Sequence, residues 1–220
     1  MNSTYIHKII LVGDSGSGKS CLGYRITTNK FNFDEQITIG VDFCSTIINV
    51  KGQNMKFNIW DTAGQEKYNS LIRGYFKGSH GCLIVFDITN RASFDNVKKW
   101  FRDVTNIQND PLNLDNITKN PNLVVMLVGN KLDLQNTRQV SREEGLLLAK
   151  EFNNYNKTMY FETSAKSGTN VRDMFYQLAE AIHNNSLIAE KEKEKIKEVN
   201  INNYGLQTNL INLTEKSRCC

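Results

Sequence analysis

An octapeptide with three glycines and a lysine-serine pair follows an apolar segment near the start of the chain. The octapeptide is Gly13–Ser20 and the apolar segment is Ile9–Val12. The glycines allow main-chain N–H groups to surround an anion, Lys19 can reach β- and γ-phosphate oxygens, and the Ser20 hydroxyl can ligate Mg²⁺. The pattern G-x-x-x-x-G-K-S therefore predicts a nucleotide phosphate loop, with a glycine-rich surface turn as the simpler alternative. The expected nucleotide contacts are Gly13, Asp14, Ser15, Gly16, Ser17, Gly18, Lys19, Ser20 and Cys21.

A second polar motif follows a long apolar run in the middle of the chain. Leu123–Val128 is typical of a central parallel strand, and Gly129–Asp133 comes directly after it. A carboxylate at Asp133 can accept hydrogen bonds from the ring N1–H and the exocyclic amine of guanine, whereas adenine carries an acceptor at N1. Because an unmatched buried polar group costs orders of magnitude in affinity, this residue can select the base. Taken alone, Asn-Lys-x-Asp is an ordinary polar turn.

A third segment supports the choice of guanine. The strand-like run Met159–Thr163 leads into Ser164–Lys166, whose main-chain amides could approach the guanine carbonyl. Both base-side motifs thus follow strand-like runs, as ligand-binding loops of parallel sheets do. The expected base-side contacts are Asn130, Lys131, Asp133, Ser164, Ala165 and Lys166.

The order of apolar runs and helical patterns predicts an α/β sheet with helices on both faces. Two strands, Phe43–Val50 and Met55–Trp60, are expected to form a hairpin across Lys51–Asn54, which makes one sheet edge antiparallel. Ser141 and Glu144 have the spacing of a capping box at a helix start. Further strands are expected at 9–12, 82–86, 123–128 and 159–163, and helices near 19–28, 67–78, 91–108, 142–153 and 170–184.

Five motifs in this order resemble the Ras superfamily of small GTPases, and within it the Rab family. Besides the three segments above, they are Thr38–Phe43 and Trp60–Glu66, and the resemblance covers about residues 5 to 183. It implies a P-loop NTPase fold with a six-stranded, mostly parallel sheet. It also implies a switch that cycles between GTP and GDP, hydrolyses GTP slowly and recruits effectors in intracellular vesicle trafficking.

The resemblance implies a metal site and a conformational switch. Thr38 would add its hydroxyl only when a γ-phosphate is present, and the Gly64 N–H would meet that phosphate. Segments around 31–43 and 62–78 are then expected to become ordered with GTP and to loosen with GDP. The expected Mg²⁺ ligands are Ser20, Thr38 and, through a water molecule, Asp61.

The same resemblance gives residues for hydrolysis. Gln65 would orient the attacking water, with Lys19 as the other catalytic residue. Arg25 and Arg73 belong to helical patterns and do not stand where an internal arginine finger is expected, so intrinsic hydrolysis should be slow and stimulated by an activating protein. Phe31 is expected to contact the guanine, with core packing as the alternative.

Composition limits the other classes. The 220 residues allow one domain with an extension, and a net charge of +4 without a basic, aromatic-rich stripe argues against nucleic-acid binding. No apolar stretch approaches the ~20 residues of a membrane span. The five cysteines lack CxxC spacing, and we expect Cys21, Cys44 and Cys82 to be reduced packing residues of a cytosolic protein. We also expect a monomer.

Two segments depart from a compact domain. Residues 109–122 contain both prolines and are expected to form an Asn-rich surface insertion, with a partner-binding loop as the alternative. Residues 5–183 are expected to form the GTPase domain and 184–220 a flexible tail, which ends in Cys219 and Cys220. This ending resembles the Rab double-cysteine prenylation site and implies lipid attachment to the cytoplasmic face of an intracellular membrane, with a cytosolic pool.

The resemblance also implies partners: a nucleotide-exchange factor, a GTPase-activating protein, a GDP-dissociation inhibitor and effectors of the GTP state. Two other function classes remain. One is a nucleotide-locked scaffold without useful turnover, against which Gln65, Thr38 and Asp61 argue. The other is a P-loop ATPase or kinase with an incidental Asn-Lys-x-Asp, against which Asp133 argues.

Overall fold

The computed structural model describes residues 4–32, 38–64, 74–106, 123–152 and 158–188. The chain divides into two compact units, Met1–Ile182 and His183–Cys220. The sheet, its covering helices and the candidate site all belong to the first unit. Of the second unit, the described part is the helical stretch 183–188. The predicted domain boundary after residue 183 and the predicted flexible tail remain predictions.

Six strands form one sheet in the order β2-β3-β1-β4-β5-β6. β2 pairs antiparallel with β3, and every other neighbouring pair is parallel. This confirms the predicted six-stranded sheet with one antiparallel edge strand. β4 and β5 are buried at every residue, as expected for central parallel strands. The strands are β1 Tyr5–Val12, β2 Val41–Val50, β3 Gln53–Thr62, β4 Gly81–Asp87, β5 Val124–Asn130 and β6 Thr158–Glu162.

The β2–β3 hairpin turns through two residues, so the predicted four-residue loop is wrong. Lys51 and Gly52 have φ values of 51° and 86°, the left-handed values that suit a tight hairpin turn. Val50 therefore pairs directly with Gln53, and both strands are longer than expected. Nothing in the side chain of Lys51 signals a positive φ, which explains the error.

The helices agree with the predicted pattern except for one interruption and for a 3-10 helix at Leu132–Thr137, which was not predicted. The expected helix near 91–108 is interrupted at Asn96, whose main-chain N–H is shared between the carbonyl groups of Ala92 and Phe94. The helix expected near 67–78 is described only from residue 74, where residues 74–76 are helical. No helix in the described ranges has both the length and the apolar character of a membrane span. The helices are α1 Lys19–Thr28, α3 Arg91–Asp95, α4 Val97–Asn106, the 3-10 helix η3 Leu132–Thr137, α5 Arg142–Phe152 and a helix at 171–188.

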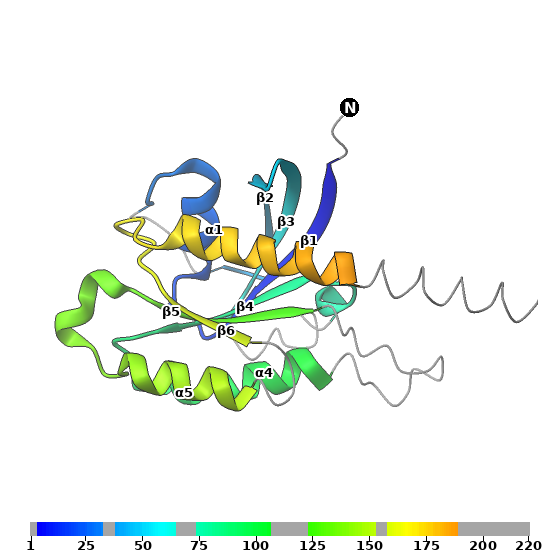
Figure 1. The fold of residues 1–220 in the computed structure, drawn as a ribbon. Helices are drawn as coiled ribbons and strands as arrows, with labels where there is room; N and C mark the ends of the chain where they lie inside the picture. The colour runs from blue at the N-terminus through cyan, green and yellow to red at the C-terminus, as the bar shows by residue number, and fades with distance from the viewer. Residues whose placement is uncertain (1–3, 33–37, 65–73, 107–122, 153–157, 189–220) are drawn as a thin grey trace, which may run out of the picture. The chain divides into compact units, whose positions relative to one another are not determined.

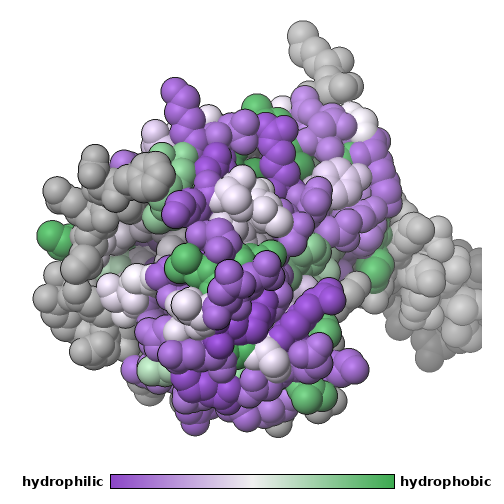
Figure 2. Space-filling model, turned by 90° about the vertical axis from the view of Figure 1, so that its left-hand side faces the viewer, coloured by the Kyte–Doolittle hydropathy of each residue, from purple (hydrophilic) through white to green (hydrophobic). Residues whose placement is uncertain are grey.

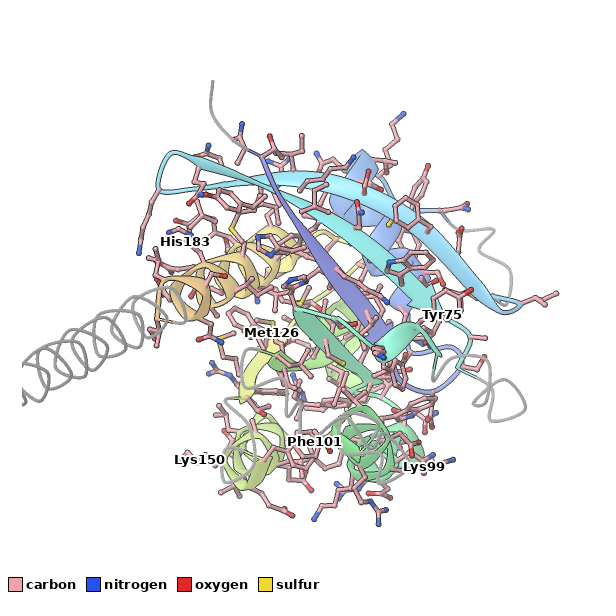
Figure 3. All side chains as sticks on the ribbon, turned by 90° about the vertical axis from the view of Figure 1, so that its right-hand side faces the viewer. Tyr75, Lys99, Phe101, Met126, Lys150 and His183 are labelled. Atoms are coloured by element: carbon pink, nitrogen blue, oxygen red, sulfur yellow. The ribbon has the colours of Figure 1, made fainter. Side chains whose placement is uncertain are left out.

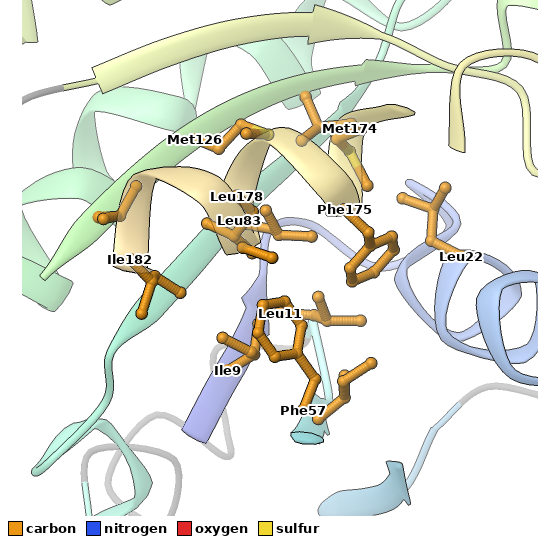
Figure 4. Packing of buried hydrophobic residues seen from close by; sticks show 14 of the residues in the cluster. Ile9, Leu11, Leu22, Phe57, Leu83, Met126, Met174, Phe175, Leu178 and Ile182 are labelled. Carbon is orange, nitrogen blue, oxygen red and sulfur yellow. The ribbon is translucent and has the colours of Figure 1, made fainter. Parts of the chain in front are cut away.

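Helices cover both faces of the sheet (Figure 1). On one face, α1 and the helix that begins at residue 171 enclose a buried apolar cluster. Figure 4 shows Phe175, Leu178 and Ile182 of that helix directed at Ile9 and Leu11 of β1. Burial of such side chains stabilises the fold by roughly 1.5–3 kcal/mol each. This packing fixes β1, and with it the start of the phosphate loop.

On the other face, α4 and α5 pack side by side. The rings of Phe101 and Phe152 stack between them with centroids 3.9 Å apart. Figure 3 shows Phe101 between the two helices and Lys99 and Lys150 on their outer sides. The α4 position matters for the site, because its residue Trp100 contacts the phosphate loop, as described below.

Candidate nucleotide site

Four loops meet at the carboxyl ends of β1, β3, β5 and β6. Hydrogen bonds or close main-chain approaches join the loop after β1 to each of the loops after β3 and β5. Figure 2 views the molecule from the side of the loops that follow β5 and β6, where hydrophilic residues dominate and hydrophobic ones are scattered. Ligands of open α/β sheets bind at this edge.

The phosphate loop has the geometry that its glycines predict. Gly13, Gly16 and Gly18 have φ values of 136°, 76° and 93°. The buried Lys19 ammonium donates hydrogen bonds to the carbonyl oxygens of Gly13 at 2.8 Å and Asp14 at 2.9 Å. Burial lowers the pKa of Lys19 to about 8, although the negative charges of Asp61 and Asp14 act to raise it. The loop therefore combines positive φ angles with a buried cation.

The Asp14 carboxylate points to α4 and to Asn96, the residue directly before it, and not into the loop. Its Oδ1 accepts from Trp100 Nε1 and its Oδ2 from Asn96 Nδ2, both at 2.8 Å. Asp14 is one of the predicted nucleotide contacts. Because both of its carboxylate oxygens are bound to other side chains, its main chain is the part that remains for this contact. Sequence reasoning missed this link, since Asp14 shares no motif with Asn96 and Trp100 and lies more than 80 positions before both.

Three oxygen-bearing side chains converge beside the phosphate loop. Ser20 Oγ lies 2.8 Å from Thr38 Oγ1, and both hydroxyl groups contact Oδ2 of Asp61. The other carboxylate oxygen, Asp61 Oδ1, is buried and has no hydrogen-bond partner. Burial raises the pKa of Asp61 to about 6, although Ser20 and Lys19 favour the charged form. Hard oxygen donors around an unpartnered carboxylate oxygen fit Mg²⁺.

Asn130 connects the phosphate loop to the base-side loops. Its Nδ2 donates to the carbonyl oxygen of Ser17 at 2.9 Å. Its Oδ1 accepts from the main-chain N–H of Ala165 at 3.2 Å and from Thr163 Oγ1 at 3.4 Å. A Cβ on Gly18 would lie 2.3 Å from Asn130 Nδ2, so the glycine is required by space as well as by its φ. Asn130 thus holds three segments together.

The base-side polar residues also contact one another. Lys131 Nζ forms an ion pair with Asp87 Oδ2 at 2.7 Å. The exposed carboxylate of Asp133 accepts from Ser164 Oγ, and Ser164 Oγ accepts from the Ser167 N–H at 3.0 Å. The Asp133 carboxylate and the Ser164–Lys166 loop are therefore adjacent, as the two motifs predict.

The structure describes three further predicted site residues, and other predicted features lie outside the described residues. A Cβ on Gly64 would lie 2.3 Å from the main-chain nitrogen of Ser15, so Gly64 lies directly against the phosphate loop. Phe31 and Cys21 are partly buried against the core cluster that α1 helps to enclose, and the guanine contact predicted for Phe31 remains a prediction. Predicted features outside the described residues are Gln65, Arg73, the 109–122 insertion, Cys219 and Cys220.

Comparison with known proteins agrees with this geometry. The family model described as "Ras family" matches residues 8–184. The chain is 41% identical over 179 residues to "Ras-related protein RABA1b" from Arabidopsis thaliana, an alignment that spans 81% of this chain and 76% of the relative. The chain belongs to the Rab group of Ras-family small GTPases. This confirms the predicted Rab-like switch of intracellular trafficking, which binds GTP and GDP and hydrolyses GTP.

Proposed function

We propose that this Rab protein uses Ser20, Thr38 and Asp61 to hold Mg²⁺ beside the phosphates of GTP. The observation that supports this most strongly is the convergence of the three side chains around the buried, unpartnered Asp61 Oδ1. When bound, the ion would neutralise charge on the β- and γ-phosphate oxygens. Thr38 would enter the site with the γ-phosphate and couple nucleotide state to shape.

The remaining site residues divide the work on the nucleotide. The main-chain N–H groups of Gly13–Ser20 cradle the phosphates, and Lys19 donates to their oxygens. Asp133 selects guanine, with Asn130 and Ser164–Lys166 supporting its loops. Gln65 orients the attacking water, and an activating protein supplies the charge stabilisation that an arginine finger provides, worth ~10³–10⁵ in rate.

The proposal extends to partners and location. An exchange factor, a GTPase-activating protein, a GDP-dissociation inhibitor and GTP-state effectors would act on a monomeric domain. Prenyl groups on Cys219 and Cys220 would anchor it to the cytoplasmic face of an intracellular membrane, with a cytosolic pool.

Competition between nucleotides tests the proposed site. Purified full-length protein is loaded with fluorescent GDP and challenged with GDP or ATP, with and without EDTA. We expect GDP to compete far better than ATP and EDTA to accelerate nucleotide release. Displacement by ATP at comparable concentration would contradict the base assignment, and release that ignores EDTA would contradict the metal site. Single-turnover hydrolysis of bound GTP separates the switch from a nucleotide-locked scaffold.

A further inference from the structure

The Arg25 side chain is bound entirely to main-chain carbonyl groups of two loops. Its Nε donates to Ala165 O at 2.7 Å, and its Nη2 donates to Lys166 O at 2.5 Å. Its Nη1 donates to Asn29 O at 2.7 Å, at the end of α1. No carboxylate in the described ranges forms an ion pair with Arg25, so the partly buried guanidinium is committed to these loops.

These contacts fix the direction of two peptide groups in the base-side loop. In a trans peptide the carbonyl and the following N–H point in opposite directions. With the Ala165 and Lys166 carbonyl groups held by Arg25, the N–H groups of Lys166 and Ser167 face the other way. The Ser167 N–H agrees with this, since it donates to Ser164 Oγ, which in turn contacts Asp133.

One of the three successive N–H groups in this loop has no hydrogen-bond partner in the described part of the chain. The Ala165 N–H donates to Asn130 Oδ1, and the Ser167 N–H donates to Ser164 Oγ. The Lys166 N–H has no hydrogen-bond partner among the residues that the structure describes. It belongs to the peptide group whose carbonyl Arg25 holds, so Arg25 controls its direction.

We propose that Arg25 is a positioning residue for guanine recognition, which directs the Lys166 N–H at the carbonyl oxygen of position 6 of the base. The inference rests on the proposed guanine site and adds a residue that does not touch the nucleotide. The planar guanidinium suits this task, because it donates to two neighbouring carbonyl groups at once, whereas a lysine ammonium acts as a point charge. Asp133 reads the neighbouring N1–H and 2-amine, so nucleotides altered at position 6 or at position 2 separate the two effects.

The test compares nucleotides that differ at one position of the base. 6-Thio-GDP keeps both donors that face Asp133 and replaces only the carbonyl oxygen, with sulfur, a weak acceptor. IDP lacks only the 2-amine. In Arg25→Ala, we expect the preference for GDP over 6-thio-GDP to fall at least about threefold and GDP release to accelerate up to about tenfold, which corresponds to the loss of one hydrogen bond between the Lys166 N–H and the base. The preference for GDP over IDP should change less than about twofold.

Two further variants complete the design. Arg91→Ala is the control, because Arg91 is also an arginine but pairs with Asp95 and Glu144. It should leave the preferences for GDP over 6-thio-GDP and over IDP unchanged. Arg25→Lys should restore part of the 6-position preference, and it also keeps the test valid if Arg25→Ala does not fold. Unchanged 6-position preference in both Arg25 variants would overturn the proposal, as would a parallel fall of both preferences. Wild-type protein that fails to prefer GDP over ATP would instead refute the guanine site itself.

Discussion

Asn130 illustrates how single residues of this site act mainly on other parts of the protein. Its amide bonds the phosphate loop through Ser17 and the base-side loop through Ala165. The side chain is buried, and both its Nδ2 and its Oδ1 form hydrogen bonds. Asn130 therefore links the phosphate loop to the base-side loop. The main chain at Gly18 also lies close to this side chain, near Asn130 Nδ2.

Gly18→Ala should separate close approach from backbone strain. The added Cβ would lie 2.3 Å from Asn130 Nδ2, and the residue has a φ of 93°. Gly52→Ala is the matched control, since its φ is 86° and nothing lies within 4 Å of its Cβ. We expect the control to lose about 1–2 kcal/mol of unfolding free energy and to keep GDP affinity. Gly18→Ala should lose more stability and release GDP at least about tenfold faster. Equal effects of both variants in urea unfolding would exclude the steric role.

Asp133→Asn should shift base preference from guanine to xanthine. The amide of the variant can donate to the carbonyl that xanthine carries in place of the 2-amine, whereas the carboxylate cannot. Competition of GDP and xanthosine diphosphate against fluorescent nucleotide measures the change, which we expect to exceed about tenfold. The control is Asp95→Asn, an exposed carboxylate on α3 that pairs with Arg91. Retained guanine preference in Asp133→Asn would remove Asp133 from base selection.

The residues of the candidate site were easier to find in the sequence than the contacts between them. Gly13–Ser20 and Asp133 were identifiable because specific chemistry demands those residue types at fixed spacing. The Asp14 link to Trp100 and the Arg25 link to Ala165 join residues 86 and 140 positions apart. Each depends on how α4 or α1 packs on the sheet, which no local pattern encodes.

At the scale of elements, α5 begins with a reciprocal capping box. Glu144 N donates to Ser141 Oγ at 3.1 Å, and Ser141 N donates to Glu144 Oε2 at 2.9 Å. Hydrogen bonds from Arg91 and from Ser141 lower the pKa of Glu144 to about 2. The box therefore joins the start of α5 to α3 as well as satisfying its first N–H groups.

Ser141→Ala should weaken this helix start. Loss of the cap leaves the Glu144 N–H without its acceptor, and we expect the free energy of unfolding to fall by about 1 kcal/mol. Urea unfolding of the GDP-bound protein measures the change, with Arg142→Ala, one residue later and exposed, as the control. GDP affinity should not change. A variant as stable as the control would show that the cap contributes nothing.

Element types were more predictable than element ends. The continuous apolar runs identified β4 and β5 as central strands, and burial at every residue agrees. The β1 start was missed, because Tyr5–Lys8 has no continuous apolar run: Tyr5 and Ile6 are exposed, and His7 and Lys8 are polar. The break at Asn96 was not predicted, and the side chain of this residue bonds to Asp14, outside the helix.

At the scale of the whole molecule, we expect the C-terminal cysteine pair to attach the protein to a membrane. One lipid gives only marginal, reversible binding, and the tail has nearly balanced charge, so stable attachment should require prenyl groups on both Cys219 and Cys220. Changing both to serine should move the protein from membrane to soluble fractions without altering GDP affinity. Each single variant is the control and should show intermediate partitioning. Intact mass without prenyl adducts, together with unchanged membrane association of the double variant, would rule out the lipid anchor.

The hydrogen bond between Trp100 and Asp14 gives the protein an intrinsic optical probe. The chain has only two tryptophans, and the second, Trp60, lies between the rings of Phe43 and Tyr75. In Trp60→Phe, all indole emission would come from Trp100, whose N–H is bound to a phosphate-loop residue. We expect nucleotide release to shift this emission, and Asp14→Ala to abolish the shift while the emission itself persists. Nucleotide loading and release could then be followed in unlabelled protein, in real time, by the fluorescence of Trp100.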